Sequence, residues 1–446
     1  MKEVVNIAFK GYKVFSKDSY TTMNNISRVN VIIGKNNSGK TSLLDIIGLI
    51  YDANSSVRAG VDVDEVIFDI PLNDTAAQKV FSFCSGIGEW DLSKLKAYFK
   101  GKLFSMKLTG KENVNFLNSD ELRSLGGHVR DITTYLSERR NSYKFCKITA
   151  ERNISPEVEA EIGLDSSGQG ATNLIRIFLN DGNYDETIIE SKLLTALNSI
   201  MMPEAEFESI RVQEVIYSEQ KFWEVFLQEK GMQRVPLSKT GSGLKTIVLV
   251  LLNLLVIPHV EEYKNAQLVY GFEELENNLH PALQRRLFDY LYKFSVENDI
   301  KLFLTTHSHI AINSFFGREQ AAIYHVVKEE GAAQIKSIET HLDKAEILND
   351  LDVKASDILQ SNGIIWVEGP SDRIYIKRWL EVFTPNEYEE GEHYQFLYYG
   401  GRLLSHYSAK EQEELINIVT TNRNAAIVID SDKRNRQASI NSTKKE

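Results

Sequence analysis

One short run near the N-terminus has the residues of a phosphate-binding loop. GKNNSGKT, residues 34–41, fits the pattern G-x-x-x-x-G-K-[ST] between an apolar strand-like run and a helix-like run. Glycines let backbone N–H groups approach phosphate oxygens, while Lys40 would neutralise charge and Thr41 would ligate Mg²⁺. The alternative is a glycine-rich strand-to-helix turn without a ligand. The residues expected to bind the nucleotide, ATP, are Gly34, Asn37, Ser38, Gly39, Lys40, Thr41 and Ser42.

Two acids and a histidine follow apolar runs later in the chain. In QLVYGFEELE, Glu273 suits the outer shell of Mg²⁺, and Glu274 could orient or deprotonate an attacking water. An acidic helix start, where Glu is common, is the other interpretation of this pair. KLFLTTHSH places His307 at the tip of a further expected strand. Together with the P-loop, these residues predict nucleotide hydrolysis, with His307 contacting the γ-phosphate.

A second glycine-flanked serine precedes the most apolar helix-like run. In KTGSGLKT, Ser242 and Gly243 lie where a helix N-terminus can bind an anion. Since the first loop would already hold one nucleotide, we expect this turn to contact the nucleotide of a second subunit. That predicts a homodimer, or a higher homo-oligomer, formed through the ATPase heads. A simple helix cap is the alternative.

The order of these motifs carries a family resemblance. The P-loop, SKTGSG, EELENNLHP and LTTHSH resemble the ABC-type ATPase heads of SMC and RecF-like proteins. The usual pattern has Asp at Glu273 and Pro at Leu275, and many relatives have Pro at His309. The resemblance implies an α/β fold in which a P-loop head is interrupted by a helical insertion.

A second group of acids lies near the C-terminus. Glu368 follows the apolar run IIWV, Asp372 lies four residues later, and Asp430 and Asp432 end the apolar run AAIVI. Strand alternation sends the last two to one side, and two parallel strands would gather all four acids at the carboxyl edge of a sheet. Crowded carboxylates need cations, and oxygen ligands favour Mg²⁺ or Mn²⁺, which could activate water against a phosphodiester. The alternative is an ordinary capped helix turn after Glu368.

These acids also carry a resemblance. VEGPSD and IDSD, with YYGGRLL between them, resemble a Toprim module, and its position behind an ABC-type head resembles the OLD family of ATP-dependent nucleases. Related members are the Gabija nuclease subunit and some retron effectors. The resemblance implies that Glu368, Asp430 and Asp432 bind catalytic metal and that Asp372 helps to hold a second ion. Complete modules continue beyond this point, so we expect a truncated chain rather than a lost activity.

The helices and strands expected around these residues divide the chain into four segments. We expect the N-terminal part of the ATPase head with the P-loop at 1–60, and an inserted arm or dimerisation region with remaining head strands at 61–230. The rest of the head would follow at 231–345, and a linker with a parallel α/β Toprim domain, incomplete here, at 346–446.

Composition sets limits on partners and location. The net charge of −11 over 446 residues argues mildly against nucleic-acid binding, although bound cations supply positive charge of their own. Two cysteines, Cys84 and Cys146, exclude a disulfide framework or zinc ribbon. We interpret TIVLVLLNLLVI as a buried core helix, find no secretory signal, and expect a cytoplasmic protein without a membrane partner.

Three functions remain open from sequence. The first is an ATP-regulated, divalent-metal-dependent DNA endonuclease or nickase in antiviral defence. The second is a RecF/SMC-like ATPase that clamps DNA or scaffolds a partner without cutting. The third is an ATP-sensing switch whose nuclease role belongs to a companion protein. The partners expected are DNA and a defence-system protein, either a helicase or a reverse transcriptase with its nucleic acid.

Overall fold

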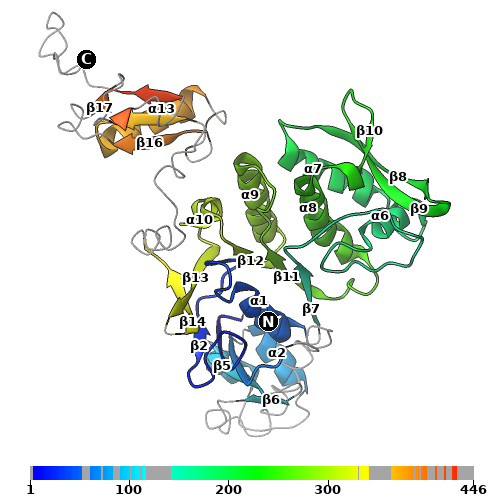
Figure 1. Cartoon of the computed structure of the whole chain (residues 1–446). Coiled ribbons are helices and arrows are strands. Elements are labelled where there is room, and N and C mark those ends of the chain that lie inside the picture. Colours follow the sequence, from blue (N-terminus) through cyan, green and yellow to red (C-terminus); the bar gives the residue numbers. More distant parts are fainter. Residues whose placement is uncertain are drawn as a thin grey trace, which may run out of the picture. The chain divides into compact units, whose positions relative to one another are not determined.

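The chain divides into two compact units, Met1–Ile347 and Leu348–Glu446, in the computed structural model (Figure 1). The structure describes residues 4–52, 61–71, 74–83, 91–100, 102–109, 113–116, 142–329, 331–340, 363–384, 388, 390, 393–398, 407–408, 416–417 and 424–428. The candidate ATPase residues all lie in the first unit, and Glu368 and Asp372 lie in the second.

The centre of the first unit is a six-stranded sheet in the order β14-β13-β3-β12-β11-β7. Its strands run parallel except β14, which pairs antiparallel with β13 at one edge. Every residue of β3 and β12 is buried, as expected for parallel strands covered on both faces. The strands are β3 (Val29–Ile33), β7 (Tyr143–Ile148), β11 (Gln267–Glu273), β12 (Lys301–Thr306), β13 (Ala321–Glu329) and β14 (Ala332–Ile338).

Helix α1 (Lys40–Tyr51) lies between this sheet and an antiparallel sheet of order β2-β1-β4-β5-β6. One core cluster joins Phe9 and Phe68 of the antiparallel sheet, Ile46 and Ile50 of α1, and Phe303 of β12. The helix that begins at the P-loop is therefore held from both sides. The other elements of this layer are β1 (Asn6–Lys10), β2 (Thr21–Met23), β4 (Glu65–Pro71), α2 (Asp74–Phe83), α3 (Leu92–Phe99), β5 (Leu103–Thr109) and β6 (Asn113–Phe116).

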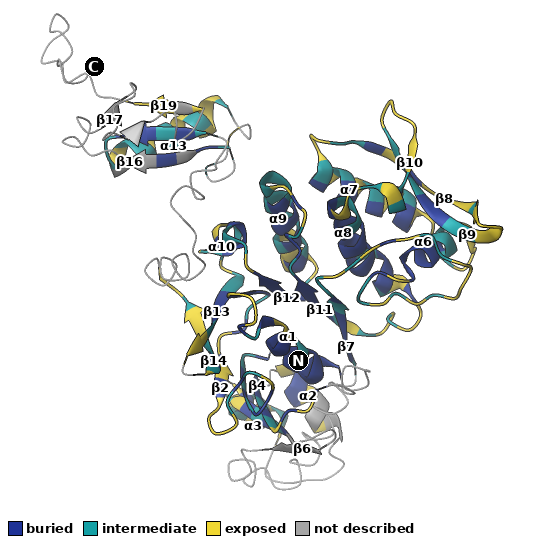
Figure 2. Ribbon diagram, in the orientation of Figure 1, coloured by how far each residue is buried: buried dark blue, intermediate teal, exposed yellow. Residues whose placement is uncertain are grey.

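Helices α8, α9 and α10 lie on the opposite side of the central sheet from α1 (Figure 1). Helix α8 is almost entirely buried, whereas α9 buries one side (Figure 2). A three-stranded sheet, β10-β9-β8, joins α6 and α7 in the inserted arm. These elements are α6 (Ala171–Asn180), η2 (Ile188–Leu193), α7 (Leu194–Met201), β8 (Phe207–Tyr217), β9 (Gln220–Glu229), β10 (Arg234–Pro236), η3 (Leu237–Lys239), α8 (Ser242–Leu251), η4 (Leu252–Val256), η5 (Ile257–His259), α9 (Pro281–Glu297) and α10 (His309–Phe315).

The predicted core helix is confirmed, with one irregularity. The run Ser242–His259 is long and apolar enough to cross a bilayer, but it is mostly buried inside the first unit. Its α-helical part ends at Leu251, and a π-helical turn follows. The Asn253 side chain, which interrupts the apolar run, donates a 2.9 Å hydrogen bond to the Leu249 carbonyl within the helix. A polar residue is thereby accommodated in an apolar core.

The N-terminal strand is shorter than the apolar pattern suggests. β1 ends at Lys10, although the run VVNIAFKGYKVF continues to Phe15. Gly11 and Lys13 both have positive φ, at 71° and 50°, so the backbone turns there instead of extending. The P-loop strand and its helix agree with their predicted positions.

The second unit contains a parallel three-stranded sheet of order β16-β15-β19. Helix α13 (Pro370–Phe383) packs Ile376 and Leu380 against a small core that includes Val367 and Phe396. The expected parallel pairing of the strand before Glu368 with the strand before Asp430 is present. The strands are β15 (Ile364–Val367), β16 (Gln395–Tyr398), β19 (Ala425–Ile427) and a separate pair, β17 (Tyr407–Ser408) and β18 (Ile416–Asn417).

Candidate functional site

The P-loop turns tightly between β3 and α1, and two glycines make that turn possible. Gly39 has φ of 117°, a conformation that L side chains rarely adopt. A Cβ at Gly34 would lie 2.4 Å from the Val326 carbonyl oxygen and 2.7 Å from Ser38 Oγ. Both positions therefore require glycine for reasons of backbone geometry.

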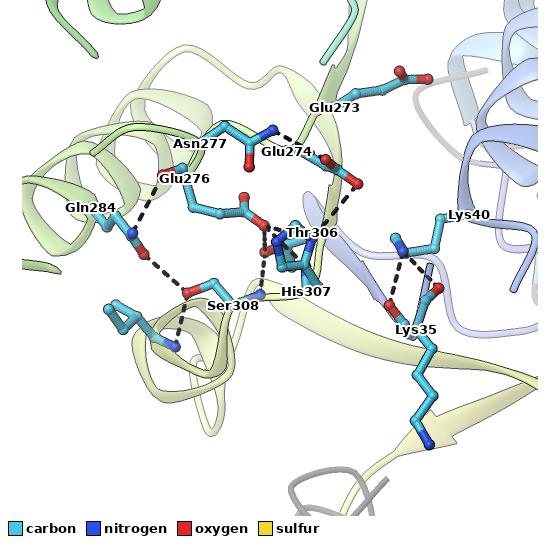
Figure 3. A network of polar contacts seen from close by, with 12 residues as sticks. Lys35, Lys40, Glu273, Glu274, Glu276, Asn277, Gln284, Thr306, His307 and Ser308 are labelled. Atoms are coloured by element: carbon cyan, nitrogen blue, oxygen red, sulfur yellow. Dashed lines mark hydrogen bonds and ion pairs between the residues drawn. The ribbon is translucent and has the colours of Figure 1, made fainter. Parts of the chain in front are cut away.

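The loop presents donors to a small pocket. Lys40 Nζ donates to the carbonyls of Gly34 at 2.8 Å and Lys35 at 2.9 Å (Figure 3). Burial lowers the pKa of Lys40 below its ordinary value. Ser38 Oγ is buried and has no hydrogen-bond partner among the described residues. The Lys40 amine, which lines the pocket and donates to two backbone carbonyls, fits a phosphate ligand, because phosphate oxygens would accept from it. The Ser38 hydroxyl has a donor left over for phosphate but is not among the residues that line this pocket.

The pocket beside the loop has a volume of about 280 Å³. Thr41 is exposed at its edge, where its hydroxyl could ligate Mg²⁺, and Glu274 reaches it from a distant part of the chain. The lining residues are Val14, Asn36, Asn37, Gly39, Lys40, Thr41, Ser42 and Glu274. The fold thus brings the loop and the second acid of EELE, far apart in sequence, to one cavity.

Glu273, the first acid, is buried at the end of β11 and paired with a lysine. Its Oε1 lies 3.0 Å from Lys147 Nζ, and Lys147 also contacts Asp45 Oδ1 at 2.9 Å. Burial alone would lower the pKa of Lys147, but the charges of Glu273 and Asp45 raise it above its usual value. Sequence reasoning missed Lys147 and Asp45, because neither belongs to a recognisable motif. The carboxylate of Glu273 remains a candidate for the outer shell of Mg²⁺, held in place by this amine.

Glu274 is held in an unusual backbone conformation. Its φ is 44°, which for a residue with a side chain costs about 1–3 kcal/mol. Its N–H donates to the Thr305 carbonyl at 2.8 Å, and its Oε2 accepts from Asn277 Nδ2 at 3.1 Å. Its Oε1 lies 3.6 Å from His307 Nδ1 (Figure 3). Glu274 lines the P-loop pocket, which makes its carboxylate a candidate general base.

Glu276 holds the end of strand β12, where Thr306 is followed by His307. It is buried, and its Oε1 accepts from Thr306 Oγ1 at 2.6 Å and from the His307 N–H at 2.9 Å (Figure 3). The same oxygen lies 3.6 Å from His307 Nδ1. The imidazole therefore stands between two carboxylates and keeps 42% of its side chain exposed. Glu276 was not predicted as a site residue; the signal that could have found it is the third acid in EELE.

The turn that carries Ser242 and Gly243, called the signature turn from here on, lies at the N-terminus of α8. Gly241 occupies the capping position, and Ser242 is the exposed first residue of the helix. A Cβ at Gly243 would lie 2.9 Å from the Asn278 carbonyl oxygen, so this turn packs closely on the loop after Glu274. Neither Ser242 nor Gly243 is among the residues that line the 280 Å³ pocket.

The C-terminal acids are only partly described. Glu368 follows β15 directly, and Asp372 Oδ2 accepts from the Gly369 N–H at 3.0 Å, which caps α13. Asp430 and Asp432 lie outside the described residues, as does the stretch YYGG apart from its first tyrosine. Within the described ranges, no group of three or more His, Cys, Asp or Glu side chains is placed to hold a metal ion.

The fold and the first site define a class. A P-loop between a central parallel strand and α1, two acids at the end of β11 and a histidine at the end of β12 form a mixed α/β ATPase head of the ABC type. Residues 93–312 match the family model described as an AAA ATPase domain. Residues 29–84 match a model described as "AAA domain, putative AbiEii toxin, Type IV TA system". The chain therefore carries a nucleotide-binding ATPase domain of the AAA type.

Solved structures with a related architecture are SMC heads. The chain is 12% identical to the SMC head domain from Thermotoga maritima, with TM-score 0.38, covering 76% of this chain and 100% of that one. It is 13% identical to an SMC head with an extended coiled coil bound to the C-terminal domain of ScpA, derived from Pyrococcus furiosus, with TM-score 0.40 and coverage of 78% and 99%. These likenesses are too distant to carry a functional argument. No curated protein matches the chain.

Proposed function

We propose that this protein is an ATP-regulated, divalent-metal-dependent DNA endonuclease or nickase of the OLD type, acting in the cytoplasm as an antiphage effector. The head, formed by 1–60, by the remaining head strands within 61–230 and by 231–345, with the inserted arm also within 61–230, would gate a Toprim-like cutting module at 346–446. The observation that carries the proposal is the parallel pairing of β15 with β19. In the sequence, β15 is followed by Glu368 and Asp372, and β19 is followed by Asp430 and Asp432.

The register supports this convergence. Trp366 pairs with Ile427, and the Val428 N–H donates to the Trp366 carbonyl at 2.8 Å. Glu368 comes two residues after Trp366, and Asp430 comes three residues after Ile427, so both follow the carboxyl ends of neighbouring parallel strands. Carboxylates gathered at such an edge suit two Mg²⁺ or Mn²⁺ ions, which would activate water and stabilise the leaving oxygen of a phosphodiester.

The head residues have separate roles in the proposal. Lys40 and Ser38 hold the phosphates, Thr41 and Glu273 serve Mg²⁺, and Glu274 activates water. His307, exposed beside Glu274, contacts the γ-phosphate. Ser242 and Gly243, at the N-terminus of α8 and outside the lining of the 280 Å³ pocket, would contact a second subunit's nucleotide. In this proposal ATP bridges the heads of two subunits. DNA is the substrate of the Toprim-like modules that follow the heads.

The family match at residues 29–84 also bears on the biological role. The model matched at residues 29–84 names a toxin of a type IV toxin–antitoxin system. A toxin-like effector of defence, with a helicase or a reverse transcriptase and its nucleic acid as companion, is in keeping with that description.

One observation favours a second candidate function. Asp372, proposed to help hold a second ion, already uses Oδ2 to cap α13. If that is its whole role, the chain is a RecF/SMC-like ATPase that clamps DNA or scaffolds a partner without cutting. The third possibility, an ATP-sensing switch whose nuclease role belongs to a companion protein, likewise needs no cutting by this chain.

Plasmid nicking tests the choice. With Mg²⁺ or Mn²⁺ and ATP, the full chain should nick supercoiled DNA. Asp430→Ala should abolish nicking while ATP hydrolysis persists, and Lys40→Ala should abolish nucleotide binding. ATP-dependent DNA retention without any nicking would establish the clamp instead. Cutting that needs a companion protein and survives Glu368→Ala would assign the nuclease to that companion.

A further inference from the structure

Arg152, in the loop after β7, joins two parts of the head that the motifs do not connect. Its Nη1 donates to the carbonyls of Thr149 at 2.8 Å and Glu273 at 2.7 Å, and its Nη2 donates to the Glu274 carbonyl at 2.8 Å. Its Nε donates to Thr246 Oγ1 at 2.9 Å. One planar guanidinium therefore binds the tip of β11 and helix α8 together.

At the end of β11, Arg152 holds the backbone that carries the carboxylate of Glu274, the proposed general base. Glu274 has a positive φ, so the direction of its side chain depends on how firmly that strained peptide is held. The Glu274 N–H is held by the Thr305 carbonyl and its carbonyl by Arg152. This carbonyl belongs to the same residue as the carboxylate that must meet the attacking water. Misplacing a reacting group by 1 Å can lower a rate by about 10²-fold.

At the other end, the same loop anchors the signature turn. Thr246 lies one helical turn after Ser242 in α8. Its neighbour Lys245 donates through Nζ to Asn153 Oδ1 at 2.8 Å, so two adjacent helix residues bind two adjacent loop residues. A shift of the N-terminus of α8 is thereby transmitted to the loop, because a guanidinium fork keeps a fixed geometry.

We propose that Arg152 is a positioning residue that couples the signature turn at Ser242 to the catalytic carboxylate of Glu274. When the second subunit's nucleotide engages Ser242, α8 and Thr246 are fixed, and Arg152 in turn fixes the Glu274 peptide for hydrolysis. The inference rests on the proposed function, in which Glu274 is the base and Ser242 meets a second nucleotide. Coupling between two binding sites commonly changes an affinity by about 5–150-fold.

Thr246→Val is the sharpest variant, because it removes the hydroxyl acceptor and keeps the shape of the side chain. The three carbonyl contacts of Arg152 remain. We expect kcat for ATP to fall at least about fivefold, of the order of the weakest usual couplings between sites, with KM unchanged and the thermal midpoint lowered only by the loss of one hydrogen bond. Arg176→Ala is the control: Arg176 makes three similar hydrogen bonds within the arm, to Asn173, Glu159 and the Ala160 carbonyl. It should leave kcat unaltered.

A double-mutant cycle separates coupling from a merely structural role. Ser242→Arg blocks the signature turn and should lower kcat in the wild-type background. If Arg152 and Thr246 carry the coupling, Ser242→Arg should cause little further loss in Thr246→Val, whereas independent sites would multiply their effects. Multiplied effects, or a wild-type kcat in Thr246→Val, would overturn the coupling and leave the proposed function intact. Unchanged kcat in both Ser242→Arg and Glu274→Gln would overturn the roles in ATP hydrolysis that the proposed function gives to these two residues.

Discussion

The imidazole Nδ1 of His307 lies 3.6 Å from Oε1 of Glu274, across the ends of two neighbouring parallel strands. The other oxygen of Glu274 accepts from Asn277, so the carboxylate is held on two sides beside the P-loop pocket. In the proposed mechanism this carboxylate takes a proton from the water that attacks the γ-phosphate, and the exposed histidine contacts the phosphate.

The first prediction concerns Glu274→Gln. The amide keeps the size of the side chain and its contact with Asn277, but it cannot accept a proton. We expect kcat to fall about 10²–10⁴-fold, the usual contribution of general acid–base catalysis, while ATP binding persists. Single-turnover hydrolysis and equilibrium binding measure the two quantities separately. A variant that hydrolyses ATP at the wild-type rate would show that Glu274 is not the base.

The second prediction concerns Glu276→Ala. This change removes the acceptor shared by the Thr306 hydroxyl and the His307 N–H. We expect a loss of about 1.5–3 kcal/mol in the free energy of unfolding, the range for hydrogen bonds to a charged group. The rate of hydrolysis should fall as well, because the strand tip that carries His307 loses its anchor. Denaturant unfolding and steady-state kinetics measure these effects, and Glu276→Gln, which keeps one acceptor oxygen, should be milder in both.

The third prediction uses the unsatisfied hydroxyl of Ser38. Among the described residues no group hydrogen-bonds the buried Oγ, so Ser38→Ala should cost no stability. If phosphate accepts from this hydroxyl, the variant should bind ATP about tenfold more weakly, one hydrogen bond to a charged group. Ser295→Ala is the opposite control: its buried hydroxyl donates to the Ile300 carbonyl at 2.8 Å, and neither residue lines the 280 Å³ pocket. It should lose about 1 kcal/mol of stability and bind ATP normally.

The residues that were predictable from sequence lie in contiguous motifs at strand ends. Lys40, Glu274 and His307 each follow an apolar run, and parallel pairing brings those ends together. Lys147 and Arg152 were not predictable, because their partners are set by the register of β7 against β11. No local pattern states which strand will lie beside β11, and β7 belongs to a stretch without a motif. Single residues that act across strands therefore appear only in the structure.

The last prediction concerns Asp45, a partly buried residue one helical turn after Thr41 in α1. Its carboxylate accepts from Lys13 Nζ and Lys147 Nζ, both at 2.9 Å, and from the Tyr12 hydroxyl at 3.2 Å. Burial alone would raise the pKa of Asp45, but the hydrogen bond from Lys13 and the charge of Lys147 lower it overall. A depressed pKa means that the folded protein favours the ionised form. Ionisation of Asp45 therefore stabilises the fold.

The sign of the pH dependence follows from this shift. The stabilisation is complete above the unfolded pKa of about 3.9 and is lost as pH falls through the lower folded value. Asp45→Asn should lower the free energy of unfolding by about 1.5–3 kcal/mol between pH 5 and 8. The difference from wild type should shrink below about pH 4, as measured by urea unfolding across pH. Asp289→Asn, at a more exposed ion pair, should change stability by less than about 1 kcal/mol. A gap for Asp45→Asn that widens in acid would contradict the assigned direction of the pKa shift, because a protonated Asp45 has no ionic stabilisation left to lose.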